Sequence, residues 1–126
     1  MKIVLDAGAL IALERREKRL WTVLKLAARR RDDVLVPSTV VAQVWRGTRR
    51  QASLARAFDA CVIAAFDGMA RDVGLLCGRT RTTDICDAHV ALVATRGCDV
   101  LYTGDPDDLE RLIAACSGPA PVILPC

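Results

Sequence analysis

The sequence predicts an α/β protein in which a mainly parallel sheet lies between layers of helices. Short apolar segments alternate along the chain with longer segments of helical spacing, and repeated strand-then-helix order is typical of parallel sheets with right-handed crossovers. Aromatic residues make up only 4% of the chain, so the core must consist of Ala, Val, Leu and Ile, as in buried parallel sheets. With 126 residues, of which 52% are hydrophobic, we expect one domain spanning residues 1–126.

The expected strands are short apolar runs that end at a turn residue or an acid. They cover residues 2–6, 34–36, 61–66, 98–103 and 121–124. The run at 61–66, CVIAAF, is rich in β-formers and is expected to be buried.

The expected helices have apolar residues at helical spacing, with polar residues that can cap them. They cover residues 7–18, 20–30, 40–47, 51–58, 67–76, 84–95 and 105–116. The second has an apolar stripe opposite Lys25, Arg29 and Arg30. Ser38 or Thr39 can cap the third helix, which should run to a glycine stop.

Cysteine and histidine usage argues against a zinc site. The six cysteines form no C-x-x-C pair, and His89 is the only histidine that could complete a ligand set. The opening segment meets an acid at Asp6 and a charge cluster from Glu14, so it does not resemble a signal peptide or a membrane span. We therefore expect a cytoplasmic protein with reduced thiols and no membrane association.

Charge is distributed unevenly although the net charge is only +3. Residues 15–56 contain twelve of the eighteen basic residues, whereas acids dominate from residue 84 onward. A protein that grips a polyanion and cuts it with bound cations needs arginines for phosphates and clustered carboxylates for the metal. The alternative, that each charge run is simply a solvated helix face, stays open for any single arginine.

Four aspartates occupy positions where ligands bind in open parallel sheets, beyond the carboxyl ends of strands. Asp6 closes the first strand, Asp105 follows the strand at 98–103, and Asp84 and Asp87 share one face at a helix start. An isolated Asp at a helix start is more often an N-cap, the role we assign to Asp67 and Asp72. A buried carboxylate at Asp6 would need a partner, and a cation would supply it.

Ligand sets made only of oxygen atoms select hard cations, so the aspartate cluster favours Mg²⁺ or Mn²⁺. Such ions bridge to substrate phosphates, and the chemistry that follows is phosphodiester hydrolysis. No histidine base is then required. Asp107 and Asp108 are expected to interact with the dipole of the last helix.

Four segments taken together resemble the PIN-domain family, in particular VapC-type toxins of toxin–antitoxin pairs. They are VLDAGALIAL, PSTVVAQVWRG, DICDAHVALVA and YTGDPDDL, in that order over essentially the whole chain. The resemblance implies a three-layer α/β/α fold and a Mg²⁺- or Mn²⁺-dependent endoribonuclease. It further implies a homodimer that a cognate antitoxin holds inactive.

Asp6, Asp87 and Asp105 match acids of the family pattern, and Thr103 matches its hydroxyl residue, which could orient a ligand or water. The sequence departs from the pattern at Gln43, where the family usually has a glutamate. Glutamine keeps an amide oxygen but loses a negative charge and cannot act as a general base.

Asp84 either restores a fourth carboxylate to the site or simply caps its helix beside Thr82 and Thr83. His89 should point to another side of the helix, and we exclude it from the site. Trp21 and Trp45 are expected to pack in the core or at a subunit contact.

Arg46, Arg49 and Arg50 follow Gln43 closely and are the candidates for binding RNA phosphates, although Arg46 could instead serve packing and an ion pair. Two functions therefore remain. The first is an active endoribonuclease that uses Asp6, Asp84, Asp87 and Asp105 with Gln43 and Thr103. The second is a PIN-like binding module that acts through RNA, an antitoxin or self-association.

Overall fold

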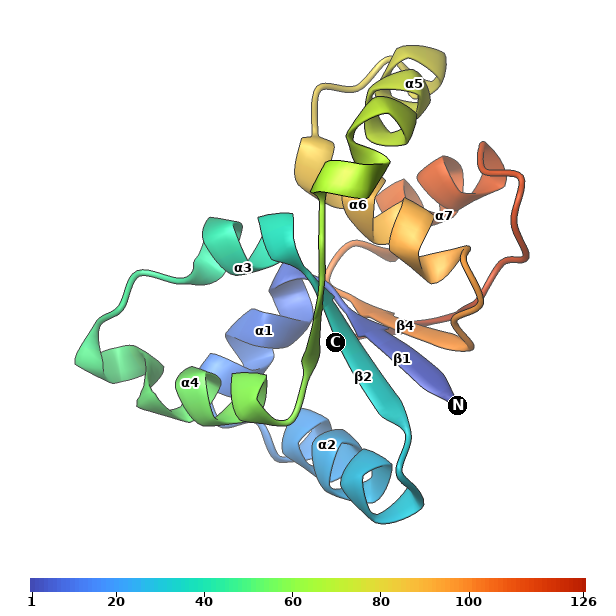
Figure 1. Ribbon diagram of the computed structural model, residues 1–126. Helices are drawn as coiled ribbons and strands as arrows, with labels where there is room; N and C mark the ends of the chain where they lie inside the picture. Colours follow the sequence, from blue (N-terminus) through green and yellow to red (C-terminus); the bar gives the residue numbers. More distant parts are fainter.

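Five parallel strands form one sheet in the order β3-β2-β1-β4-β5, as the computed structural model of residues 1–126 shows (Figure 1). The strands are β1 (Lys2–Leu5), β2 (Asp33–Pro37), β3 (Val62–Ala64), β4 (Val100–Thr103) and β5 (Val122–Pro125). The chain builds outward from β1 to β3 and then returns to the other side of β1 with β4. This reversal of strand order creates a crevice beyond the carboxyl ends of β1 and β4, where ligands bind in such sheets.

Seven helices surround the sheet. They are α1 (Ala7–Glu14), α2 (Lys18–Arg30), α3 (Ser38–Val44), α4 (Ala52–Asp59), α5 (Ala70–Thr80), α6 (Ile85–Ala94) and α7 (Pro106–Ala114). Helices α1, α2 and α4 lie on one side of the sheet, and α5, α6 and α7 lie on the other (Figure 1). The predicted α/β class with a three-layer, PIN-like arrangement is therefore confirmed, and the sheet is entirely parallel.

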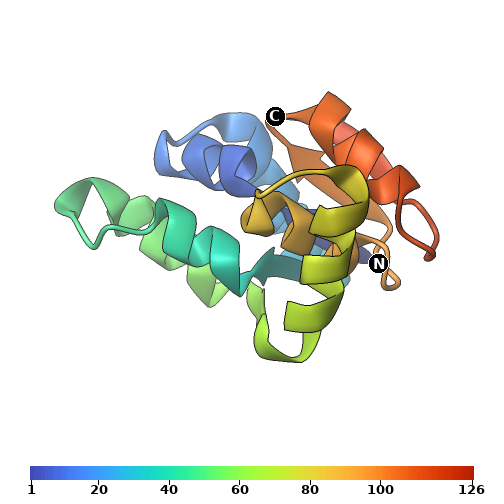
Figure 2. The same cartoon turned by 90° about the horizontal axis from the view of Figure 1, so that it is seen from above.

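Helix α3 closes the carboxyl end of the sheet between the two helical layers. It packs against α1 on one side and α6 on the other, and Figure 2 shows it from above beside both. The buried His89 ring of α6 joins it through a 2.8 Å hydrogen bond between Nδ1 and the Thr39 hydroxyl. The residues of α3 are thereby brought to the edge of the crevice.

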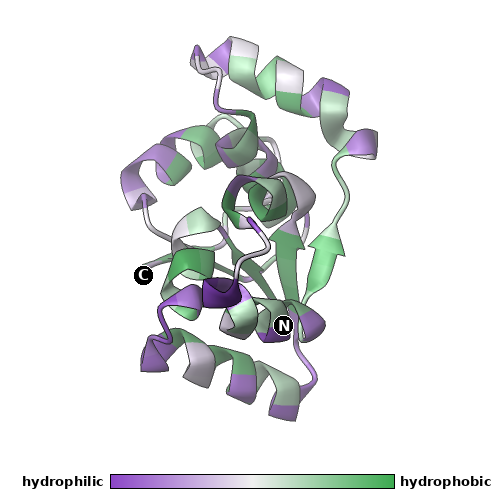
Figure 3. Cartoon of the chain, turned by 90° about the vertical axis from the view of Figure 1, so that its left-hand side faces the viewer, coloured by the Kyte–Doolittle hydropathy of each residue, from purple (hydrophilic) through white to green (hydrophobic).

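The core is aliphatic, as the composition predicts. Every residue of α6 from Ala88 to Ala94 is buried, and Val4, Leu5 and Leu101 on the central strands are fully buried. Figure 3 shows hydrophobic residues along the strands and hydrophilic ones along the outer helix faces. No helix combines the length and apolarity needed to cross a lipid bilayer.

Strand β3 differs from the expectation of a buried strand at 61–66. Only Val62–Ala64 is extended, and Val62 and Ile63 are exposed. The reason is topological: the strand pairs with β2 alone and forms an edge of the sheet. Sequence composition does not distinguish an edge strand from a central one when both are apolar.

Several helix ends also differ from the expected ones. Neither Ser38 nor Thr39 caps α3, which begins directly after Pro37 and ends at Val44 rather than continuing to Gly47. Asp67 lies in a short 3₁₀ turn that precedes α5 and does not cap it. Asp72, also expected to be a cap, instead makes a 2.6 Å salt bridge with Arg96.

The first turn of α1 lies in close contact with the loop after β4. A Cβ atom added at Gly8 would lie 2.7 Å from the Cα and the N of Gly104, closer than packed atoms approach one another. The close approach lets the backbone N–H of Gly104 reach the Asp6 carboxylate, 3.3 Å from Oδ2. Glycine at position 8 is therefore a structural requirement of the crevice.

We expect Gly8→Ala to destabilise the fold by about 1–3 kcal/mol, because the added methyl forces α1 away from the β4–α7 loop. The matched control is Gly74→Ala in α5, where an added Cβ meets no atom within 4 Å. That control should stabilise the protein by about 0.4–1 kcal/mol through reduced chain entropy. Urea unfolding measures both; equal effects of the two substitutions would contradict the close approach.

Candidate metal and RNA site

Three of the four predicted aspartates cap three different helices that begin at the crevice. Asp6 caps α1, Asp84 caps α6 and Asp105 caps α7. Each carboxylate accepts the N–H of the third residue of its helix, at 3.1, 3.0 and 3.3 Å respectively. Because the first N–H groups of a helix lack partners within the helix, each cap satisfies one of them and holds its carboxylate in place.

Asp6 is the deepest of these residues, with only 5% of its surface exposed. Burial raises the pKa of its carboxyl group, while hydrogen bonds from Thr103 and from the backbone of Ala9 and Gly104 act in the opposite direction. The strand register determines this position. Leu5 of β1 pairs with Tyr102 of β4, so the next residues, Asp6 and Thr103, lie side by side at the carboxyl end of the sheet. The Asp6 backbone N–H also donates to the Tyr102 carbonyl, at 3.2 Å.

Thr103 joins two of the aspartates. Its side chain is fully buried, and its hydroxyl accepts the backbone N–H of Asp105 at 2.9 Å while also hydrogen bonding to Asp6. The hydroxyl therefore links the Asp6 carboxylate after β1 to the backbone of Asp105 after β4. Its predicted role in orienting a ligand or water stays a prediction.

Asp87 lies one helical turn beyond the cap of α6 and is half-buried. Its pKa is raised to about 7, first by burial, next by the charge and hydrogen bonding of Asp84, and then by the charges of Asp6 and Asp105. All of these effects raise the pKa. The structure thus brings the other three predicted aspartates within electrostatic range of Asp87.

The donor set of the crevice suits a hard cation. Its aspartates offer oxygen, and the nearby thiols are poor ligands because burial and neighbouring carboxylates raise the pKa of Cys86 and raise that of Cys126 to about 11. No three Asp, Glu, His or Cys side chains form a group that could hold a metal ion in this conformation. The cap contacts of Asp84 and Asp105 use only Oδ1, and the two carboxylates also hydrogen bond to the side chains of Asp87 and Asp108 respectively.

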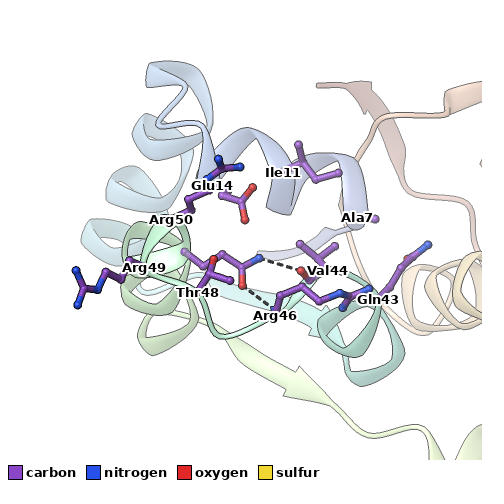
Figure 4. Close-up of a pocket in the computed structure, with 10 residues that line it drawn as sticks. Ala7, Ile11, Glu14, Gln43, Val44, Arg46, Thr48, Arg49 and Arg50 are labelled. Carbon is purple, nitrogen blue, oxygen red and sulfur yellow. Dashed lines mark hydrogen bonds between the residues drawn. The ribbon is translucent and has the colours of Figure 1, made fainter.

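Gln43 is exposed on α3, the helix that packs against both α1 and α6. It lines a hollow of about 700 Å³ between α1 and residues 43–51 (Figure 4). The three predicted phosphate-binding arginines, Arg46, Arg49 and Arg50, line the same hollow. The structure therefore groups Gln43 with the arginines, and it places Ala7, the neighbour of Asp6, in the wall that they share.

His89 is fully buried, its ring packs edge-on against Phe66, and burial lowers its pKa. Trp21 is half-buried and donates its ring N–H to the Leu13 carbonyl at 3.1 Å. Trp45 packs edge-on against Phe58 but is exposed, so it is not a core residue, and a subunit contact there stays a prediction.

Sequence reasoning missed Gly8, Gly104 and Cys126 as neighbours of the crevice. Cys126 reaches it because its backbone N–H pairs with the Thr103 carbonyl, which brings the end of β5 beside Asp6. A lone cysteine carries no sequence signal of this position. The paired glycines of DAG and TGD are a weak signal, because each resembles an ordinary turn residue.

Comparisons with known proteins give a likeness in structure but not in sequence. No family model matches this chain, and no curated protein matches its sequence. A chain in the crystal structure of VapBC2 from Rickettsia felis, bound to a DNA fragment from their promoter, superposes with a TM-score of 0.72. The match covers 100% of this chain and 99% of that chain at 16% sequence identity, a likeness that shows a shared fold.

We expect Asp87→Asn to stabilise the metal-free protein at pH 8, because it removes a charge that burial and three carboxylates disfavour. The pKa of Asp87 in the fold, about 7, lies above its ordinary value of 3.8. Above about pH 7, ionised Asp87 therefore destabilises the fold by its full amount. This destabilisation disappears as the pH falls toward about 4. The gain from Asp87→Asn should shrink over the same range.

Thermal unfolding at pH 8, 6 and 4 in a chelator measures this gain. Asp59→Asn is the matched control, since Asp59 is an exposed aspartate at the end of α4, and it should show no such trend. A stabilisation by Asp87→Asn that is independent of pH would contradict the proposed clustering of charge.

Proposed function

We propose that this protein is a Mg²⁺- or Mn²⁺-dependent endoribonuclease that hydrolyses RNA phosphodiester bonds. One observation carries the proposal: the crevice buries Asp87 and brings Asp6, Asp84 and Asp105 so close to it that their charges add to the effect of burial and raise its pKa to about 7. A crevice with so much uncompensated negative charge has the composition of a hard-cation site. The arginine-lined hollow beside it supplies the opposite charge that a polyanionic substrate requires.

In this proposal Asp6, Asp87 and Asp105 hold the cation, and Asp84 supplies a fourth carboxylate. A bound Mg²⁺ or Mn²⁺ makes water a stronger nucleophile and stabilises the charge of the leaving oxygen. The protein contributes preorganisation, because three helix N-termini and the Thr103 hydroxyl fix the carboxylates before the substrate arrives. The buried His89 takes no part in this chemistry.

The proposed biological role is that of the toxin of a toxin–antitoxin pair. It rests on the resemblance of four sequence segments to VapC-type toxins and on the shared fold with a chain of the VapBC2 complex. On this account a cognate antitoxin is the protein partner, and the toxin acts as a homodimer.

A binding module is the second candidate, and two observations favour it. Gln43 lacks the charge of the glutamate usual in the family, and the aspartates do not form a ready-made ligand group in this conformation. Such a protein would keep the arginine-lined hollow and act through RNA, an antitoxin or a second copy without cleaving RNA.

We expect the purified protein to cleave RNA with Mg²⁺ or Mn²⁺ and to stop when a chelator is added. Asp6→Asn and Asp87→Asn should each reduce the rate by about 100-fold or more, because a ligand charge is lost. Asparagine is preferable to alanine at position 6, since it keeps the cap of α1 and thus the fold.

The control for this experiment is Asp59→Asn, which should cleave like the parent protein. Circular dichroism and thermal unfolding check that each variant is folded. If Asp6→Asn and Asp87→Asn cleave as fast as the parent, the proposed ligands are wrong.

Gln43→Glu separates the two candidate functions. For an active nuclease we expect slower cleavage, because the new carboxylate lies in the arginine-lined hollow and repels the RNA backbone. A binding module with a weakened metal site predicts the reverse, a large gain in Mn²⁺ affinity and in cleavage. Mn²⁺ titration and a cleavage assay of parent and variant decide between them, with Gln43→Ala as the uncharged control.

A further inference from the structure

Helix α3 is short, and few of its own residues fix its place at the crevice. It contains seven residues, no side chain caps its N-terminus, and only Val40 among its residues is buried. A helix of this length is unstable in isolation, so its position depends on contacts with neighbouring elements. These neighbours are α1, α6 and β2. The polar contacts that α3 makes with them therefore decide where its exposed side chains lie.

Two polar contacts join the first turn of α3 to α6. The hydroxyl of Thr39 lies 2.8 Å from Nδ1 of His89. The Thr39 carbonyl accepts a weaker hydrogen bond from the Cys86 thiol, whose sulfur lies 3.6 Å away. The same short stretch of α6 also carries Asp87. The contacts thus connect α3 directly to a helix that holds proposed cation ligands.

The histidine in this contact is surrounded by apolar residues. All residues of α6 from Ala88 to Ala94 are buried, and His89 is the only polar one among them. Its second ring nitrogen, Nε2, lies near the backbone of Ala65 but is a buried atom with no hydrogen-bond partner. Such an atom destabilises a fold, and a leucine of similar volume would not carry this cost. Core packing alone therefore does not explain a histidine at this position.

A second buried side chain fixes the opposite end of α3. Gln51 is 4% exposed, and its Oε1 accepts the backbone N–H groups of Arg46 and Gly47 at 2.7 and 3.1 Å. Its Nε2 donates to the carbonyl of Val44, the last residue of α3, at 2.9 Å (Figure 4). Gln51 thus orders the end of α3 and the segment that follows. It makes no contact with the start of the helix, where His89 lies.

We propose that His89 is a positioning residue, whose hydrogen bond to Thr39 fixes α3 against α6 and so keeps Gln43 beside the aspartate crevice. Apolar contacts are non-directional and do not by themselves set the height of one helix along another, whereas a hydrogen bond between two defined atoms does. The consequence for RNA rests on the proposed nuclease function. The placement of α3 does not.

Hydrogen exchange of backbone amides, followed by mass spectrometry, tests this placement in the metal-free protein. The test variants are Thr39→Val, which replaces the hydroxyl by a methyl group of similar size, and His89→Leu. Thr39→Ser keeps the hydroxyl and serves as the conservative variant. The matched control is Thr80→Val, because the Thr80 hydroxyl is also partly buried but bonds to Leu76 of its own helix, at 2.8 Å.

We expect the amides of residues 42–45 to exchange about fivefold faster in Thr39→Val, the factor that corresponds to the loss of one ordinary hydrogen bond. His89→Leu should show the same local change, while its melting temperature equals or exceeds that of the parent because the unpartnered nitrogen is removed. The double variant should exchange no faster than either single variant, since both remove the same bond. Thr39→Ser and Thr80→Val should exchange like the parent in this segment.

The proposal is overturned if Thr39→Val exchanges like the Thr80→Val control, or if Thr39→Ser exchanges like Thr39→Val. A histidine that serves only core packing predicts another pattern. In that case His89→Leu lowers the melting temperature and speeds exchange along α6 as well as α3, which would also overturn the proposal. The Thr39 variants decide the question even if His89→Leu does not fold.

Mn²⁺ binding and RNA cleavage separate this inference from the nuclease proposal. No aspartate of the crevice lies on α3, so Thr39→Val should bind Mn²⁺ like the parent, and weakened binding would contradict a role confined to α3. If the parent cleaves RNA, Thr39→Val should raise KM and leave kcat unchanged, because substrate contacts away from the reacting phosphate are lost. A parent that never cleaves RNA refutes the nuclease function, whereas the exchange data still decide the role of His89.

Discussion

The site depends on one arrangement, the convergence of three helix N-termini at the carboxyl edge of a parallel sheet. Asp6, Asp84 and Asp105 each cap one of these helices, so the same contact that starts the helix also fixes a carboxylate. The reversal of strand order between β1 and β4 brings the helices together. For these aspartates, capping and ligand binding are therefore compatible roles.

Asp87 lies in the first turn of α6, yet burial and the charges of the other three aspartates raise its pKa to about 7. The protein thus concentrates negative charge around one half-buried carboxyl group. The positive charge lies outside the crevice, in the hollow ordered by Gln51. This separation matches the two requirements of a polyanion-cutting site, a cation at the reacting phosphate and guanidinium groups at its neighbours.

The sequence was sufficient to predict the fold class and the grouping of the four aspartates, because strand ends are local features and parallel strands bring them to one edge. It did not predict that β3 is an exposed edge strand, since pairing partners are set by tertiary structure. It also did not predict the hollow that Gln43 lines together with the three arginines. That hollow depends on α3 ending at Val44 and on the Gln51 contacts of the next segment, neither of which has a local signature.

Cation binding by the aspartates is tested most directly by a titration of the metal-free protein with Mn²⁺, in which the electron paramagnetic resonance signal reports the free ion. The account predicts that the parent protein binds Mn²⁺ and that Asp105→Asn, which keeps the cap of α7, weakens this binding strongly. Asp72→Asn, at an exposed aspartate that pairs with Arg96, should bind like the parent. Failure of the parent protein to bind Mn²⁺, or equal binding by all three proteins, would contradict the account.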